Sequence, residues 1–540
     1  MQHAVWGTGY NAAKFMAGID KNQISFFIDK DLSKTGKFFG KPILHPSEIA
    51  TWDDLFIYVP HNFYDEIQSF LRHQGLHEGI NFQKYDDKLL IEYEQSEKDL
   101  EYAIEKIREL ADSWKGGTLF LCSHLLTKKS YKDYARVLMD IFQDLHLLTE
   151  AWWYDVGLLE AAFGTDMLVA PSIWDHYTMA SDVPDDVGAG NQEEQAYLRE
   201  VALQVRNIFP EADLATCRYK AVCIEKYIYA LLRCLSPARI VCYDSVSPGH
   251  HMLRCICEKK NIPVIFTHPG IIPGTISFDT RGEMGESLPA VFSKQFSRLP
   301  VDREELEQTE RIWTYLFESE LNRKIQPTND CISYIKERIK PGRPVIFFAG
   351  QNDVLSHMVP YMDITEKYHS PIFRSSLEAV VYLAAICKQN DWNLVYKPHP
   401  MYTQPEKRGS LPSNIIFVEF GDVNRIIDFS DVTLTILSST CYNALIRYKP
   451  VVMLGYTQLR GKGCTYEAFE KDKIEDAIKA ALEKGFTQEQ QDAFLLHMAQ
   501  CLKYYLYDDL QECPIRYGRP VPKSMDEFYE LERLLRDGNV

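Results

Sequence analysis

The stretch LVYKPHPMYTQ, residues 394–404, places a lysine and a histidine between two prolines directly after an apolar run. Because proline has no N–H to donate to a sheet, Pro398 is expected to end the strand that precedes it. Pro400 restricts the backbone of His399. Lys397 and His399 would then be held at the carboxyl end of a strand, where open α/β sheets bind their ligands. The alternative is a strand-end loop whose polar residues are simply solvated.

A second polar cluster, Ser438, Ser439 and Thr440, follows an apolar run and precedes an expected helix over 441–447. Hydroxyl groups and the unpaired backbone N–H groups of a helix start can hold a phosphate. One such residue would be an ordinary N-cap, which remains the alternative, whereas three in a row favour a phosphate site. If the strands before this cluster and before Lys397's loop are neighbours in one sheet, the two clusters face one crevice.

A third candidate opens the chain, where GTGYNA follows a short apolar run and starts an expected helix. In this dinucleotide fingerprint Gly7 and Gly9 would form the tight turn, and Asp29, after the second strand, would bind a ribose. The motif predicts a possible nucleotide in the N-terminal domain. The alternative is a Rossmann-like domain whose pocket is empty or used for packing. Asp29 and Asp31 also spell DxD, which we interpret as strand-end acids rather than metal ligands.

Composition limits the classes of partner. The net charge is −17, with 76 acidic against 59 basic residues, which argues against nonspecific binding to nucleic acid or anionic lipid. The 13 cysteines form no CxxC pairs, and without a signal peptide they indicate reduced thiols in the cytoplasm. His251, Cys255 and Cys257 lack a zinc spacing and are expected on a packed helix. No apolar run approaches the roughly 18 residues of a membrane span, so membrane association would be peripheral at most.

Alternating strands and helices predict an α/β protein with two Rossmann-like lobes, preceded by a smaller Rossmann-like domain. Two such lobes joined by a helical segment are typical of the GT-B architecture of glycosyltransferases. The clearest unit has expected strands at 345–349, 393–397, 415–418, 432–437 and 451–454, and helices are expected to fill the rest of the chain. The expected parts are a nucleotide-binding-type domain at 1–95, a helical linker at 96–116, an acceptor lobe at 117–300, a helical connector at 301–340 and a donor lobe at 341–540.

The His399-Pro400 motif, the Ser/Thr cluster and the run ALIRYKPVVMLG resemble the capsule-polysaccharide synthesis family. They also resemble GT-B transferases that use CMP-activated acidic sugars, such as sialyltransferases and 3-deoxy-manno-octulosonic acid transferases. Gly350-Gln351 and the run GKGCT at 461–465 fit the same family, and the resemblance spans about residues 235–470. It implies phosphate binding without a metal or other required cofactor. The implied donor-binding residues are Gln351, Lys397, His399, Pro400, Ser438, Ser439 and Thr440.

The sequence departs from this family where the first lobe usually carries an acidic pair before a glycine. Here the strand expected at 264–267 runs into His268, Pro269 and Gly270, and the acid is missing. The following run IPGTISFDTRGEMGES matches the family's Gly-Thr…Asp…Gly pattern and offers Asp279 and Glu283. The catalytic base therefore stays open among His268, Asp279 and Glu283. A histidine suits general-base chemistry near pH 7, and the alternative is a loop histidine that caps backbone groups.

The leading functional prediction is a cytoplasmic glycosyltransferase, placed in the cytosol or at the inner face of the plasma membrane. It would move a sugar from a nucleotide-sugar donor to an oligosaccharide or lipid-linked glycan acceptor of a bacterial surface polysaccharide. Glycerol- or ribitol-phosphate transfer from a CDP-alcohol is a second possibility, although the aspartate usual before the serine pair is here Leu437. A non-catalytic sugar-nucleotide-binding protein and an NAD-dependent oxidoreductase acting through the N-terminal domain remain as further alternatives.

Overall fold

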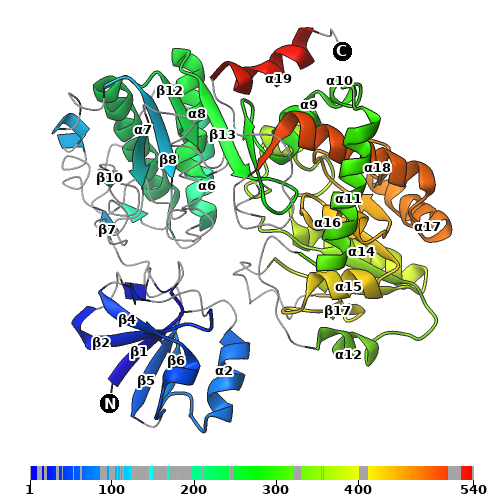
Figure 1. Ribbon diagram of the computed structural model, residues 1–540, viewed down its shortest axis with the longest axis horizontal. Helices are drawn as coiled ribbons and strands as arrows, with labels where there is room; N and C mark the ends of the chain where they lie inside the picture. Colours follow the sequence, from blue (N-terminus) through cyan, green and yellow to red (C-terminus); the bar gives the residue numbers. More distant parts are fainter. Residues whose placement is uncertain are drawn as a thin grey trace. The chain divides into compact units, whose positions relative to one another are not determined.

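The apolar runs of the sequence form strands of three parallel-rich sheets, so the α/β class is confirmed (Figure 1). The chain divides into two compact units, Met1–Ile240 and Val241–Val540. The computed structural model describes residues 2–8, 12, 15–16, 21–31, 36–38, 40–52, 54–60, 64–85, 94–95, 104–105, 107–109, 111, 115–122, 145–149, 167–169, 179–180, 196–208, 212–242, 245, 247–321, 330–353, 356, 358–399, 411–508 and 525–537.

The first sheet lies within the first 85 residues. Its order is β3-β4-β2-β1-β5-β6, and all neighbours are parallel except β3 and β4. The elements are β1 (Gln2–Trp6), η1 (Lys21–Gln23), β2 (Ile24–Ile28), β3 (Lys37–Phe38), β4 (Lys41–Leu44), η2 (Pro46–Glu48), β5 (Leu55–Val59), α2 (Tyr64–His73) and β6 (Phe82–Lys84). Two apolar clusters cover its faces, and their buried members all come from residues 4–82. This part of the chain therefore has a core of its own.

The second sheet has the order β10-β9-β8-β12-β13-β14-β21. Its elements and the helices between them are β8 (Thr118–Cys122), β9 (Leu145–Thr149), β10 (Met167–Val169), α6 (Ala196–Ile208), α7 (Leu214–Leu235), β12 (Arg239–Cys242), α8 (Pro248–Lys260), β13 (Val264–Pro269), β14 (Thr275–Asp279) and β21 (Leu506–Asp508). A separate two-stranded sheet pairs β7 (Glu94–Gln95) with β11 (Met179–Ala180). The helix expected over 96–116 lies largely outside the described residues.

Two strands near the C-terminus, β20 (Tyr466–Glu467) of the third sheet and β21 of the second, correct the sequence prediction. The chain after residue 455 was expected to be helical, yet β21 forms an antiparallel pair with β14. β14 itself pairs antiparallel with β13, so the run after Gly270 turns back as a strand. Thr275 explains the tight return, because its hydroxyl donates to Ile272 O at 2.6 Å and its carbonyl accepts from the Gly270 N–H at 2.7 Å. An added Cβ at Gly270 would lie 2.0 Å from Thr275 Oγ1, so glycine is needed there.

The third sheet is parallel throughout, with the order β17-β16-β15-β18-β19-β20. Its elements are β15 (Val345–Ala349), α13 (Asp363–Tyr368), α14 (Ser376–Gln389), β16 (Asn393–Lys397), β17 (Ile415–Phe417), α15 (Val423–Phe429), β18 (Val432–Thr435), α16 (Thr440–Ile446), β19 (Val451–Met453), β20 (Tyr466–Glu467), η7 (Lys471–Lys473) and α17 (Ile474–Lys484). Around it lie η5 (Met284–Glu286), α9 (Leu288–Val291), α10 (Ser293–Phe296), α11 (Arg303–Ser319), α12 (Cys331–Lys336), α18 (Gln488–Gln500), the π-helical η8 (Cys501–Tyr505) and α19 (Met525–Asp537).

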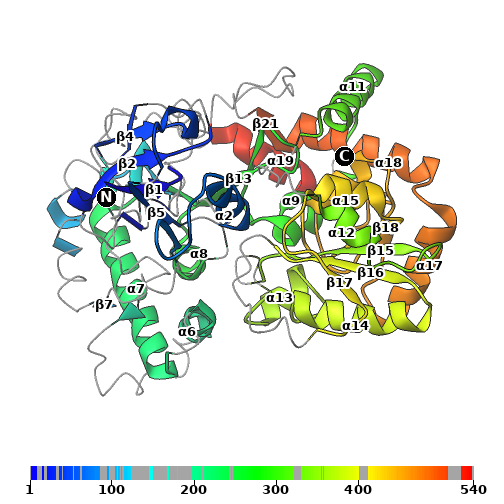
Figure 2. The same ribbon diagram turned by 90° about the horizontal axis from the view of Figure 1, so that it is seen from below.

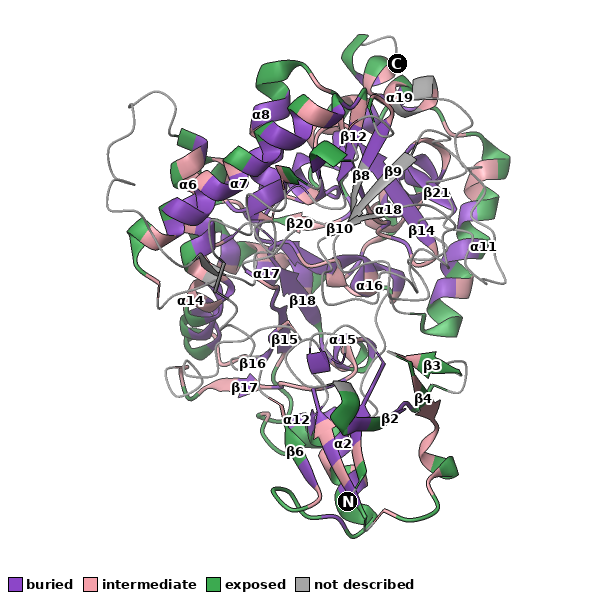
Figure 3. Cartoon of the chain, turned by 90° about the vertical axis from the view of Figure 1, so that its left-hand side faces the viewer, coloured by how far each residue is buried: buried purple, intermediate pink, exposed green. Residues whose placement is uncertain are grey.

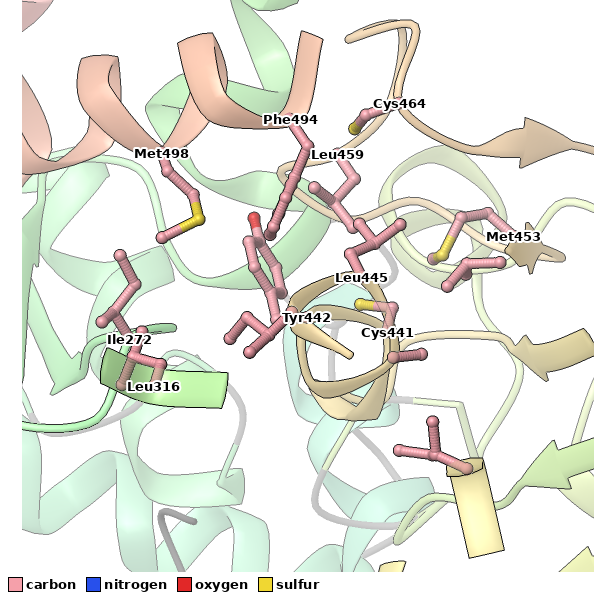
Figure 4. Packing of buried hydrophobic residues seen from close by; sticks show 14 of the residues in the cluster. Ile272, Leu316, Cys441, Tyr442, Leu445, Met453, Leu459, Cys464, Phe494 and Met498 are labelled. Carbon is pink, nitrogen blue, oxygen red and sulfur yellow. The ribbon is translucent and has the colours of Figure 1, made fainter. Parts of the chain in front are cut away.

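This sheet is covered on both faces, which fits the continuous apolar runs of its strands. Figure 2 shows α14 on one side of the sheet and α15 on the other. Alternate residues of β16 follow the two layers, since Leu394 and Tyr396 belong to the core with α14 and Val395 to the core with α15. Figure 3 shows β18 in the colour of buried residues. In Figure 4, Tyr442 of α16 lies beside Phe494 of α18.

Candidate functional site

Three parallel strands of the third sheet, β15, β16 and β18, end in the polar residues that the sequence singled out. We call the residues that follow them, Gln351, Lys397, His399 and Ser438–Thr440, the C-terminal edge. The condition that the strands before the two polar clusters are direct neighbours is not met, because β15 lies between β16 and β18. Parallel strands nevertheless present their carboxyl ends at one edge of the sheet, so β15 contributes the middle of the edge.

Gln351 occupies this middle position and is 4% exposed. Its Oε1 accepts the backbone N–H of Leu437 at 2.8 Å, which links the end of β15 to the segment after β18. Its Nε2 is buried and has no hydrogen-bond partner among the residues that the structure describes. A buried amide with an unused donor costs about 1–3 kcal/mol, so the group is expected to have a ligand.

Lys397 ends β16 and is 8% exposed. Burial lowers the pKa of its ammonium to about 8, while Cys331 and Asp422 act weakly in the opposite direction. Within the described part of the chain, no hydrogen bond or ion pair satisfies this ammonium. An unpaired buried cation is costly unless an anion approaches it. The backbone of Pro398, which follows, lies close to the end of β15, since an added Cβ at Gly350 would lie 3.2 Å from Pro398 Cα.

The hydroxyl cluster, which consists of Ser438, Ser439 and Thr440, follows β18 and is half-buried. Ser438 Oγ lies 2.9 Å from Thr440 Oγ1 and accepts the Thr440 N–H at 3.3 Å, and the Ser438 N–H donates to Thr435 Oγ1 at 3.0 Å. Ser439 is the N-cap of α16 but makes no capping hydrogen bond with its side chain. Ser438 thus fills part of the capping role that was the alternative interpretation, while the Ser439 hydroxyl is not used as a cap.

Sequence reasoning missed the support behind this edge. Asp353 is 8% exposed and accepts from both the N–H (2.8 Å) and the hydroxyl (2.7 Å) of Ser376, the first residue of α14. The Gln351 N–H reaches the same hydroxyl at 3.4 Å. These bonds fix the loop after β15 to the start of α14. The hydrogen bonds between Asp353 and Ser376 join residues 23 positions apart in the chain. The sequence offered one signal for them, an aspartate two residues after Gln351.

The candidate base residues lie on β13 and after β14. His268 and Glu283 form an ion pair, with Nε2 3.2 Å from Oε2, and His268 Nδ1 lies 3.0 Å from the Pro269 carbonyl oxygen. Both ring nitrogens therefore lie within hydrogen-bond distance of an acceptor oxygen. The ring is partly exposed and the carboxylate mostly buried. The structure thus brings these two sequence candidates together.

Asp279, the third candidate base, has a different environment. It is 2% exposed, and its carboxylate accepts backbone N–H groups from Arg281 (2.8 Å), Gly282 (3.2 Å) and Leu288 (2.8 Å). Burial raises the pKa of this carboxyl to about 6, against the effect of those donors. The side chain closes the loop between β14 and α9, and its oxygens are already occupied.

At the N-terminal edge, which consists of Gly7, Thr8 and Asp29, the polar groups satisfy one another. The Gly7 N–H donates to Ile28 O at 2.6 Å. Asp29 Oδ2 accepts the Thr8 N–H (3.0 Å) and hydroxyl (2.6 Å), and Oδ1 accepts the Asp31 N–H at 3.0 Å. Asp29, which was expected to bind a ribose, thus accepts hydrogen bonds from Thr8 and Asp31. Gly9 lies outside the described residues.

Two sequence-predicted residues follow Lys397 and Pro398 in the chain. His399 is half-buried directly after the buried Pro398, while Pro400 lies outside the described residues.

His251, Cys255 and Cys257 lie on α8, as expected. Among the described residues no group of three or more histidine, cysteine or acidic side chains is arranged to hold a metal ion. No helix in the described ranges has the length and apolarity of a membrane span.

Comparison with known proteins gives distant structural similarities. No protein-family model and no curated protein matches the sequence. Solved structures similar to this chain include the beta Kdo 2,7 transferase KpsC of Thermosulfurimonas dismutans (18% identity, 51% of this chain and 80% of that one, TM-score 0.32). The glycosyltransferase SnogD of Streptomyces nogalater (14%, 79% and 100%, 0.28) and the UDP-GlcNAc 2-epimerase of Methanocaldococcus jannaschii (11%, 71% and 98%, 0.32) are others. At TM-scores this low they decide neither the arrangement of the lobes nor the reaction.

Proposed function

We propose that this protein is a GT-B glycosyltransferase that moves an acidic sugar from a CMP-activated donor to a growing surface glycan. The observation that carries the proposal is a pair of donors at the C-terminal edge. Gln351 Nε2 is buried without a hydrogen-bond partner among the described residues, and beside it stands the ammonium of Lys397, a residue that is 8% exposed. A cation and a neutral amide beside three hydroxyls suit a phosphate oxygen better than a sugar hydroxyl, because an anion satisfies both donors at once.

In the proposed reaction the C-terminal edge stabilises the leaving group. As the bond between the sugar and the phosphate breaks, negative charge develops on the phosphate oxygens. Lys397, His399 and the hydroxyl cluster would neutralise that charge. Their ligand set contains no carboxylate, so we expect donor binding without a divalent metal ion.

The His268–Glu283 pair is our proposed acceptor of the incoming hydroxyl's proton. In the observed geometry both ring nitrogens face protein oxygens, those of Glu283 and of the Pro269 carbonyl. To remove a proton from an acceptor hydroxyl, the neutral imidazole would have to turn one ring nitrogen toward that hydroxyl. Asp279 would keep the loop in place rather than touch the acceptor, because its oxygens hold three backbone N–H groups.

Calorimetric titration of the full chain with CMP, CDP, UDP and GDP, each with and without EDTA, tests the proposal. CMP is expected to bind best and to be insensitive to EDTA. A requirement for Mg²⁺, or binding of UDP at least about tenfold tighter (~1.4 kcal/mol), would contradict the CMP-sugar assignment. Tighter binding of CDP than of CMP would instead favour phosphoalcohol transfer.

A further inference from the structure

The turn that carries Glu283 packs against two segments that connect strands of the third sheet. Glu283 precedes η5, in which Met284 has a φ of +50°, an uncommon value for a residue with a side chain. A Cβ added to Gly285 would lie 1.7 Å from the Tyr368 carbonyl oxygen and 2.8 Å from that of Tyr456. The turn therefore contacts the backbone of Tyr368, the last residue of α13, and of Tyr456, which follows β19. Glycine at position 285 permits this close approach.

Glu286 anchors the same turn through the side chains of Arg254 and His369. It is 1% exposed, and one carboxylate oxygen pairs with the guanidinium of Arg254 on α8. The other lies 3.3 Å from Nε2 of His369, which is also 1% exposed and directly follows α13. A buried carboxylate with two partners fixes position strongly, since removing one partner leaves a charge uncompensated.

His369 connects this anchor to the C-terminal edge. Its carbonyl oxygen accepts the Tyr456 N–H at 2.7 Å, and an added Cβ at Gly455 would lie 2.6 Å from that oxygen and 2.5 Å from Ile436 Cγ2. Ile436 precedes Leu437, whose N–H donates to Gln351. A continuous set of packed and hydrogen-bonded groups thus runs from the Glu283 turn to the edge that we propose binds phosphate.

We propose that Glu286 and His369 are positioning residues that hold Glu283 against His268 and tie this pair to the C-terminal edge. This inference rests on the proposed function for its catalytic meaning, but its structural content does not depend on that function. Neither residue needs to touch the substrate. Their effect passes through the orientation of the imidazole, so a variant that releases the turn should expose the His268 ring nitrogens.

Site-resolved labelling with diethyl pyrocarbonate, read by mass spectrometry, tests this directly. Glu286→Gln and His369→Phe should raise the labelling rate of His268 roughly two- to tenfold, the lower part of the range of coupling within one contact network. Glu283→Gln should raise it equally. His369→Gln, which keeps a donor toward Glu286, should restore the slow rate. Glu258→Gln is the matched control, because Glu258 also pairs with Arg254 but is exposed.

Unchanged labelling of His268 in folded Glu286→Gln and His369→Phe overturns the proposal, and so does equal acceleration by Glu258→Gln. If Glu286→Gln does not fold, the comparison of His369→Phe with His369→Gln decides. Where a transferase assay exists, Glu286→Gln should lower kcat in the wild-type background and have no further effect beside Glu283→Gln. Failure of the wild-type chain to bind CMP would refute the proposed function and leave the labelling result unaffected.

Discussion

The N-terminal and C-terminal edges both follow parallel strands and both carry polar residues, yet they differ in how those residues are satisfied. At the N-terminal edge both oxygens of Asp29 accept donors from its own loop. At the C-terminal edge Gln351 Nε2 is buried without a hydrogen-bond partner among the described residues, and Lys397, which carries the other donor, is 8% exposed. Because unsatisfied buried donors are costly, we propose that the second edge is the one that binds a ligand. A fingerprint motif alone does not make this distinction.

Replacing Lys397 should produce the largest effect. Lys397→Met removes a charged donor, which is worth roughly 1.5–3 kcal/mol, or about a 10- to 150-fold loss of CMP affinity. The variant should unfold at the same or a higher temperature, because the buried ammonium has no partner within the described residues. Calorimetry with CMP and thermal denaturation measure the two effects. Loss of stability with unchanged affinity would mean that Lys397 serves packing.

Lys462 supplies a matched control for that experiment. Burial lowers the pKa of its ammonium to about 8 as well, but its Nζ donates to Pro289 O (3.0 Å), Ser293 O (3.0 Å) and Ser293 Oγ (3.2 Å). Lys462→Met should therefore lower stability, because it leaves these acceptors unpaired, and should leave CMP affinity within about twofold. An equal loss of CMP affinity in both variants would show that burial of a lysine, rather than its position, is responsible.

Changes at the other donors of the edge should follow in size. His399→Ala should weaken CMP binding about tenfold or more through loss of one hydrogen bond to a charged group. Its melting temperature should change little, since the half-buried ring follows the strand rather than filling the core. Unchanged affinity in titrations of this variant would remove His399 from the site.

Gln351→Glu separates the two functions of this side chain. The carboxylate keeps an acceptor for the Leu437 N–H but replaces the unused donor with a negative charge. We expect the fold to survive and CMP binding to fall at least tenfold, because the new charge repels phosphate (~1.4 kcal/mol per tenfold). Binding that survives in Gln351→Glu would place the phosphate elsewhere.

The N-terminal edge should give the smallest effect on donor binding. Asp29→Asn keeps acceptor capacity on one oxygen and should cost local stability of roughly 1–3 kcal/mol. Deleting residues 1–92 should leave a folded chain that binds CMP, since the core of the first sheet comes from residues 4–82. Aggregation of the shortened chain, or loss of CMP binding in it, would show that this part is integral to the fold that binds the donor.

Local sequence predicted the strands of the third sheet well because they are buried on both faces and read as continuous apolar runs. Val345–Ala349 and Asn393–Lys397 were located with these bounds. The order of the strands was not predictable, since placing β15 between β16 and β18 depends on packing of the whole sheet. β21 was missed for a related reason: three residues, Leu506–Asp508, follow a helix without a break signal and pair with a distant strand.

The same division holds for the site. Lys397, His399 and the hydroxyl cluster could be proposed from the sequence because residue type and a strand end coincide in a short stretch. A preference among His268, Asp279 and Glu283 could not, because it depends on which oxygens accept backbone N–H groups in the folded chain. The contact of Gly285 with the Tyr368 carbonyl joins segments far apart in the chain, so no local sequence pattern could predict it.

Proton uptake on CMP binding tests the central claim most directly. The folded pKa of Lys397, about 8, lies below its ordinary 10.5, so between these values the folded chain holds fewer protons than the unfolded chain. The cost of burying the charged amine is therefore present below pH 8 and fades as the pH rises to 10.5.

A phosphate beside the amine should raise this pKa. Calorimetry at pH 8, in buffers of different ionisation enthalpy, should then show uptake of roughly half a proton per CMP, since about half of the amines are unprotonated at their pKa. CMP affinity should also fall as the pH rises above 8. Lys397→Met should abolish the uptake, and Lys462→Met should preserve it. Absence of proton uptake in the wild-type chain, or its persistence in Lys397→Met, would contradict a phosphate site at the C-terminal edge.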